Sequence, residues 1–126
     1  MRVGQNKEVY LYVAEDATYA KGSQRAFKAS SFVGAAAAGE TTTIFRFKEI
    51  DTHLSTDAVD SFTLTHTSDA NVEVIQTVLA AMGNPHGGFV VVHDFGTGES
   101  LKFPAIKSTG TAVTLTGAPV VVSSEA

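Results

Sequence analysis

Four histidines, His53, His66, His86 and His93, are the residues best suited to bind a metal ion or to exchange protons near neutral pH. Their spacing matches no standard zinc motif. His66 and His93 each lie near the end of a segment that predicts a β-strand. If those strands pair, the two imidazoles and the carboxylate of Asp94 could form a metal site with two histidines and one carboxylate. We favour the alternative, in which the histidines are isolated and bond to backbone or water.

The other chemical motifs are incomplete. Asp51, Asp57 and Asp60 lack the glycine and distal glutamate of a calcium loop, so we interpret them as a solvated acidic turn. No Gly-x-Ser-x-Gly sequence supplies a nucleophilic serine. Gly96-Thr97-Gly98 precedes a predicted strand, which favours a hairpin turn over the helix N-terminus of a phosphate site. We therefore predict no catalytic, cofactor-binding or metal-binding residue, and a protein that is not an enzyme.

The composition excludes further classes of protein. A chain of 126 residues with 44% hydrophobic and 17% charged residues is long and apolar enough for one core. Cysteine is absent, which excludes disulfides, thiolate zinc sites, iron–sulfur clusters and a cysteine nucleophile. No run of about 20 apolar residues predicts a membrane span, and no secretion signal opens the chain.

The charges are unevenly distributed. Residues 1–48 contain seven basic and four acidic residues, and residues 49–126 contain two basic and nine acidic ones. A basic front and an acidic body could pair head to tail between copies of the chain. The net charge of −4 argues against nucleic acid as the main partner.

Alternating apolar residues predict three strands in the first half of the chain, at residues 8–13, 41–48 and 61–67. Residues 14–31 show no convincing period, so we expect them to be irregular. The segment 34–39, Gly-Ala-Ala-Ala-Ala-Gly, is bounded by glycines and predicts either a flexible joint or a close-packed crossing.

One amphipathic helix is predicted over residues 70–82. Ser68 or Asp69 can cap its first turn, and Gly83 before Asn84-Pro85 predicts its end at a left-handed residue. Its apolar stripe, which needs a sheet to cover it, consists of Val74, Ile75, Val78, Leu79 and Met82.

The second half predicts more strands. Residues 89–93 form a continuous apolar run, which is typical of a strand buried on both faces. A turn over 95–100 leads to a short strand at 101–103, and residues 111–116 alternate again. Residues 119–122 predict a last strand or a tail that adds to a partner's sheet edge.

We therefore predict an α+β fold, mainly an antiparallel β-sheet or sandwich, with the helix packed on one face. The small-residue segment divides the chain into an N-terminal arm, residues 1–39, and an α+β body with a C-terminal tail, residues 40–126.

The segment from Thr41 to Leu115 resembles small structural proteins encoded beside the capsid genes of tailed bacteriophages, particularly marine ones. Four features in order carry the resemblance. These are the strand Phe62-Thr63-Leu64-Thr65, the helix ending near Met82, the stretch Asn84-Pro85-His86-Gly87-Gly88-Phe89-Val90-Val91-Val92, and a final threonine-rich strand. Residues 1–39 match nothing in that family.

The resemblance implies a head decoration or cement protein, which binds the outside of a capsid and locks neighbouring capsomers together. The expected partners are the major capsid protein and further copies of the chain, in a symmetric oligomer, without nucleic acid or membrane. The expected location is the capsid surface, after synthesis in the host cytoplasm. The alternatives are a head–tail joining or tail component, and a small metal-dependent enzyme that uses His66, His93 and Asp94.

Six residues are our candidates for contacts with a partner. Tyr10 and Tyr12 would serve as aromatic anchors, Arg25 as a basic one, and Val120, Val121 and Val122 as a strand that adds to a neighbour.

Overall fold

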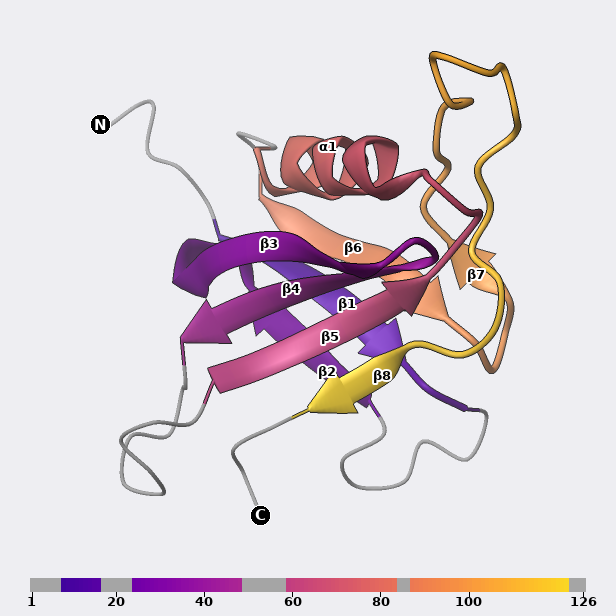
Figure 1. The fold of residues 1–126 in the computed structure, drawn as a ribbon. Coiled ribbons are helices and arrows are strands. Elements are labelled where there is room, and N and C mark those ends of the chain that lie inside the picture. The colour runs from indigo at the N-terminus through magenta and orange to yellow at the C-terminus, as the bar shows by residue number, and fades with distance from the viewer. Residues whose placement is uncertain (1–7, 17–23, 49–58, 84–86, 123–126) are drawn as a thin grey trace.

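In a computed structural model, the described residues form two four-stranded β-sheets and one α-helix (Figure 1). The residues described by the structure are 8–16, 24–48, 59–83 and 87–122. The first sheet has the order β2 (Gln24–Lys28), β1 (Val9–Ala14), β6 (Gly88–Asp94), β7 (Glu99–Ser100). The second sheet has the order β3 (Phe32–Gly39), β4 (Thr42–Lys48), β5 (Val59–Thr65), β8 (Val120–Val122).

The pairing of the strands is mostly antiparallel. Among the described strands, only β1 and β6 pair in parallel, with Leu11 beside Val90 and a register shift after Tyr12. A short 3-10 helix, η1 (Ala29–Ser31), leads the chain from β2 in the first sheet to β3 in the second. The predicted α+β fold, a mainly antiparallel sandwich with one helix, is confirmed.

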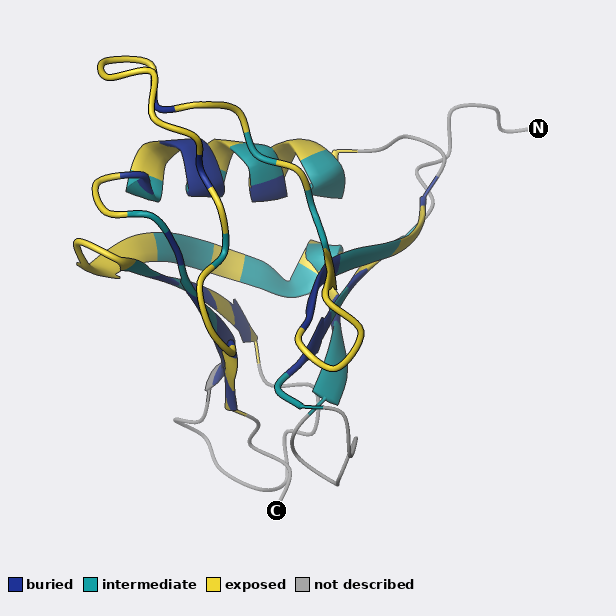
Figure 2. Ribbon diagram, turned by 90° about the vertical axis from the view of Figure 1, so that its right-hand side faces the viewer, coloured by how far each residue is buried: buried dark blue, intermediate teal, exposed yellow. Residues whose placement is uncertain are grey.

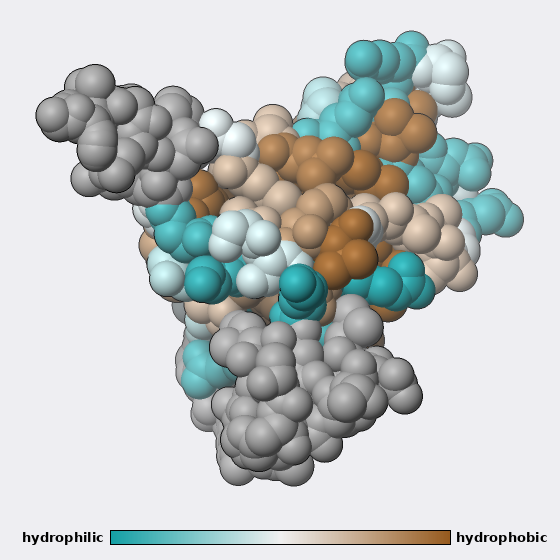
Figure 3. Space-filling view, turned by 90° about the vertical axis from the view of Figure 1, so that its left-hand side faces the viewer, coloured by the Kyte–Doolittle hydropathy of each residue, from teal (hydrophilic) through white to brown (hydrophobic). Residues whose placement is uncertain are grey.

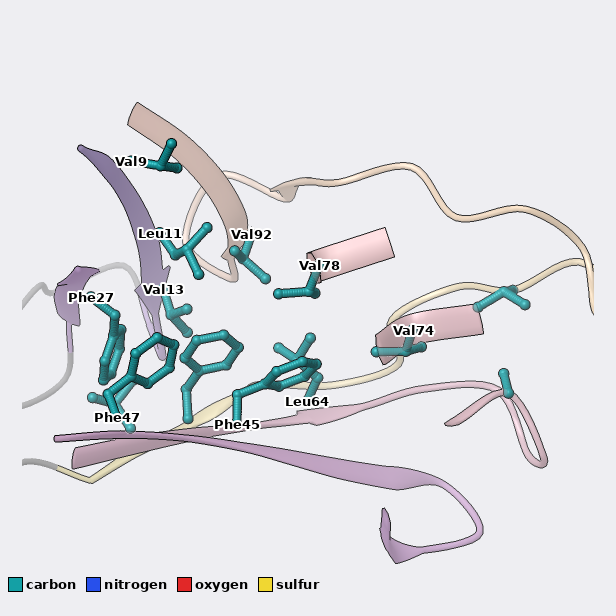
Figure 4. Close-up of a cluster of buried hydrophobic side chains, with 14 of the residues drawn as sticks. Val9, Leu11, Val13, Phe27, Phe45, Phe47, Leu64, Val74, Val78 and Val92 are labelled. Carbon is teal, nitrogen blue, oxygen red and sulfur yellow. The ribbon is translucent and has the colours of Figure 1, made fainter. Parts of the chain in front are cut away.

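A layer of phenylalanines fills the space between the two sheets (Figure 4). The rings of Phe27 and Phe62 lie 5.1 Å apart and those of Phe45 and Phe62 lie 5.0 Å apart, between centroids. Phe47 stacks in the same layer, 4.9 Å from Phe27. Phe45 and Phe47 face inward on β4 while Arg46 is exposed, as the alternation predicts.

The helix α1 (Asn71–Met82) closes the space above this layer. Val74 and Val78 are fully buried and point toward Val92 of β6 and Leu64 of β5 (Figure 4). Figure 2 shows that buried residues lie on the side of α1 that faces the sheets, while much of its upper side is exposed. The predicted helix is therefore confirmed within one residue at its start.

The predicted ends of the helix are wrong in detail. Ala70 is the N-cap and no side chain caps the first turn, because Asp69 adopts a left-handed conformation and its N–H donates to the carbonyl of Glu40. Gly83 has φ −84° and is not left-handed. Its N–H donates to the carbonyl of Ala80, which tightens the last turn without a positive φ.

Two segments of the predicted arm are regular structure. The glycine-bounded segment 34–39 belongs to β3, which pairs with β4 along its length, so the prediction of a joint or crossing is wrong. Residues 24–28, expected to be irregular, form β2 because Phe27 enters the phenylalanine layer opposite Leu11. The predicted boundary after residue 39 falls at the end of β3, just before the turn into its paired strand β4.

The later strand predictions also need correction. Residues 101–103 are not a strand, since only Leu101 continues the pairing of β7, through its N–H to Val92. Residues 111–116 do not form a strand and contribute only an isolated β-bridge between Leu115 and His66. The N–H of Thr114 donates a hydrogen bond to the hydroxyl of Thr67 instead of to a backbone carbonyl. Residues 120–122 form the last strand, β8, paired with β5 of the same chain.

The phenylalanine layer yields a first prediction. The substitution Phe62→Ala should lower the free energy of unfolding by about 3–5 kcal/mol, since it removes a buried ring and leaves a cavity. Phe89→Ala is the matched control, because Phe89 is 62% exposed, and should cost about 1 kcal/mol or less. Urea unfolding followed by circular dichroism measures both, and equal losses would contradict this view of the core.

Candidate interaction surface

His66 is buried in a polar network that ties α1 to the second sheet. Its Nδ1 lies 2.8 Å from the carbonyl oxygen of Thr67 and must carry the proton, because a carbonyl only accepts. Nε2 therefore accepts from the hydroxyl of Thr43 at 2.8 Å, and Thr43 Oγ1 accepts from Asn71 Nδ2 at 2.9 Å. Both nitrogens of His66 are thus used by the fold.

A hydroxyl bonded to an imidazole whose other nitrogen is held by an acceptor resembles the nucleophile and base of a hydrolase. Here, however, Thr43 has no exposed surface and His66 is 1% exposed. A substrate cannot reach the hydroxyl without disrupting the core. We assign this pair to stability and to the placement of the first turn of α1.

His93 lies in the first sheet, whereas His66 follows β5 of the second. The strands that carry the two histidines therefore do not pair, which corrects the geometry on which the metal hypothesis rested. Asp94 Oδ1 accepts from the N–H groups of Gly96 and Thr97, at 2.9 and 3.2 Å, and shapes the β6–β7 turn. Within the described residues, no three histidine or carboxylate side chains gather as a metal site would need. His53 and His86 lie outside those residues.

The acidic turn is also corrected in part. Asp60 is the second residue of β5 and is buried, and its Oδ2 lies 2.9 Å from Arg25 Nη2 of β2. Arg25 faces the interior beside Phe27, 5.8 Å from the ring centre, and its side chain is 15% exposed. This ion pair crosses from one sheet to the other, so the predicted basic anchor lies mostly inside the protein. Asp51 and Asp57 lie outside the described residues.

Tyr10 and Tyr12 lie on the outer face of the first sheet together with Phe89, which the apolar run of residues 89–93 predicts to be buried. Tyr10 pairs with Phe89 of β6, and the ring centroids of Tyr12 and Phe89 are 5.4 Å apart. Tyr10 is 41% exposed and Phe89 62%. We call Tyr10, Tyr12 and Phe89 the aromatic face.

Phe89 differs from the prediction because β6 is buried only near its end. The second sheet and α1 pack on the inner face of the first sheet, so Val92 is buried while Phe89 points outward. β1 and β6 both begin on the left-hand side of Figure 1, and hydrophobic surface gathers in the centre of that side (Figure 3).

The aromatic face is held rigidly by the sheet. The hydroxyl of Tyr12 donates to Gln24 Oε1 of β2 at 2.6 Å, which fixes its ring against that of Phe89. Burial, and secondly the carboxylate of Asp94, raise the pKa of Tyr12, so it remains a neutral donor at physiological pH. Rigid aromatic rings lose little conformational entropy when they bind a partner.

The tail valines, Val120, Val121 and Val122, lie on the second sheet and do not form a continuous exposed patch. Val121 is buried against the core, while Val120 and Val122 are about half exposed on β8. The N–H of Val121 donates to Glu15 Oε2 at 2.6 Å, which joins the end of β8 to the chain just after β1. The free side of β8 is therefore already occupied at its centre.

A separate pocket is lined by Ser100, Leu101, Lys102, Phe103, Val113, Thr114 and Leu115. Four of these seven residues are apolar, and none is a histidine or a carboxylate. Among the described elements, no helix has the length and apolar character needed to span a membrane.

Comparison with protein-family models, curated proteins and solved structures gives no match to this chain.

The buried network yields a prediction about stability. Thr43→Val keeps the shape of the side chain but leaves His66 Nε2 without its donor, so it should cost about 1–3 kcal/mol. Thr63→Val, on the same sheet but half-exposed, should change stability by about 0.5 kcal/mol or less. Urea unfolding of the two variants gives the comparison, and a Thr43→Val variant as stable as the control would argue against the network.

His93 makes stability depend on pH. Burial lowers its pKa below the usual value, although Asp94 acts in the opposite direction. The unfolded chain therefore binds more protons, so stability is complete above about pH 6.5 and falls as the pH drops through that value toward the folded pKa. His93→Gln should flatten the fall between about pH 7 and 5. Urea titrations across this range measure it, and an unchanged slope would exclude His93 as the cause.

Proposed function

We propose that this protein is a non-enzymatic structural component of a virus particle, a decoration or cement protein that binds the outer surface of a phage head. The aromatic face carries the proposal. Exposed tyrosine and phenylalanine on a rigid sheet are the residue types that dominate binding between proteins, and their exposure is unfavourable unless a partner covers them.

The arrangement of the polar side chains supports a binding role. Thr43 and His66 are sealed in the core, Arg25 and Asp60 hold the two sheets together, and Asp94 supports a turn. Each of these side chains makes a contact that stabilises the fold. Tyr10 and Phe89, by contrast, are exposed on the first sheet and contribute little to the core of the described part of the chain.

The expected partner is the major capsid protein, which the resemblance of residues 41–115 to phage structural proteins suggests. A standard interface between two proteins has an apolar, often aromatic, centre and a polar rim. Lys28, which pairs with Tyr10 across β1 and β2, is exposed and would contribute to such a rim. Binding of many copies at equivalent positions would then stiffen the shell.

The test is cosedimentation of the purified protein with heads of the phage that encodes it. Saturable binding that raises the resistance of the heads to heat or osmotic shock is the expected result. Absence of binding to intact heads would overturn the proposal. Saturation at a small fixed number of copies per particle would instead favour the head–tail joining alternative.

Variants of the aromatic face sharpen this test. Tyr10→Ala and Phe89→Ala should each weaken binding to heads by about tenfold or more, since hot-spot residues lose at least that when truncated. Phe95→Ala is the matched control, because Phe95 is 48% exposed but follows the opposite end of β6. Equal effects of Phe95→Ala and Phe89→Ala would show that the aromatic face is not the contact surface.

A further inference from the structure

Residues 100–103 continue the edge of the first sheet at β7. The N–H of Leu101 donates to the carbonyl of Val92 in β6. Successive residues at such an edge direct their backbone groups to opposite sides, so those of Ser100 and Lys102 point away from β6. Within the described chain, no hydrogen bond uses the backbone N–H or carbonyl of Ser100 or Lys102. This edge is therefore able to accept a further strand.

Residues 113–116 form a comparable edge beside the second sheet. The backbone groups of Thr114 and Thr116 bond to the chain at the end of β5 and just after it. Those of Val113 and Leu115 alternate with them and therefore point away from β5. They bond to no other described residue. Each sheet thus has a short edge with unused backbone donors and acceptors.

The pocket described above lies between these two edges and has a volume of about 280 Å³. The two segments that line it run side by side on the face turned to the viewer in Figure 2. They meet at the tip of their loop, where the N–H of Ile106 donates to the carbonyl of Thr111. Below that contact, no backbone hydrogen bond joins the described residues of one segment to those of the other. The pocket keeps the two edges apart.

The side chains around the pocket favour a peptide with one apolar side. Leu101, Phe103 and Leu115 pack against the hydrophobic core, and Val113 is buried, so the floor of the pocket is apolar. Lys102 is exposed and is the one charged side chain among the lining residues. A strand bound here would alternate between the apolar floor and the surroundings of the Lys102 ammonium. A carboxylate is favoured at that second position.

We propose that this pocket binds an extended peptide segment of a partner protein, in which small apolar residues alternate with acidic ones. The backbone of the peptide bonds to Ser100 and Lys102 on one side and to Val113 and Leu115 on the other. Strand addition of this kind draws affinity from the main chain and selectivity from alternate side chains. The pocket is close to the smallest usual size for ligand sites, about 300 Å³, which favours a short segment with side chains such as valine.

This surface is separate from the aromatic face. Tyr10 and Phe89 belong to the starts of β1 and β6, on the left-hand side of Figure 1, whereas residues 100–115 lie on the right-hand side. The proposal therefore does not depend on a role in virions.

The experiment is an NMR titration of the isotopically labelled full chain with a blocked pentapeptide in which valine alternates with aspartate. Saturable shifts are expected at the backbone amides of Lys102, Val113 and Leu115. A matched peptide with methyl groups on alternate backbone nitrogens loses its donors and should bind about tenfold more weakly or less tightly still. Absence of saturable shifts at these amides, or equal binding of the methylated peptide, would overturn the proposal.

Charge reversal tests the preference for an acidic segment. Lys102→Glu should weaken binding of the aspartate peptide by about threefold or more and strengthen binding of a peptide with lysine in place of aspartate. Lys48→Glu is the control, because Lys48 is exposed at the end of β4, on the opposite side of Figure 1, and should leave both affinities unchanged. Circular dichroism verifies that both variants are folded. Affinities that do not respond to Lys102→Glu would contradict the acidic preference.

Discussion

The contact of Phe27 with Phe47 and Phe62 is the interaction on which the rest of the structure depends, because it joins the two sheets. Phe27 comes from β2 of the first sheet, and the other two rings come from β4 and β5 of the second. The ion pair between Arg25 and Asp60 lies beside this layer and crosses the same gap. A buried ion pair contributes little net stability, so the apolar rings supply the free energy while the charges favour one alignment of the sheets.

The same strand supplies both the core and the proposed binding surface. In β1, Val9, Leu11 and Val13 are buried, while Tyr10 and Tyr12 point to the other face. Successive side chains of a strand alternate in direction, so packing of the first set against the phenylalanine layer orients the second set without further contacts. Any rigid-body change of β1 would disturb stability and the proposed binding together, whereas substitution of the exposed Tyr10 should affect the proposed binding with little effect on the core.

The elements that could be predicted from the sequence, such as β4, β5 and α1, are those in which apolar residues recur with the period of a strand or a helix. It did not predict β2 or β3. The alanines of β3 have weak strand propensity, and they form a strand because the hairpin to β4 supplies backbone partners. The same rule holds for the direction of the side chains. Alternation predicted that Tyr10 and Tyr12 share one face of β1, but the exposure of Phe89 was not predicted, because an apolar run does not reveal which of its faces a sheet covers. The partners of Arg25 and His66 are distant in sequence and emerge only from the fold.

The parallel pairing of β1 with β6 has a consequence for the order in which the chain folds. β1 lies between β2 and β6, so a strand made near the start of synthesis must wait for one made much later before its sheet is complete. The hairpin of β3 and β4 and its neighbour β5 need only local contacts and can form first. Closing the large loop between β1 and β6 is entropically costly, so folding of the first sheet should be slow relative to the second. During that interval the apolar side of the second sheet stays uncovered, and an uncovered apolar sheet surface promotes aggregation.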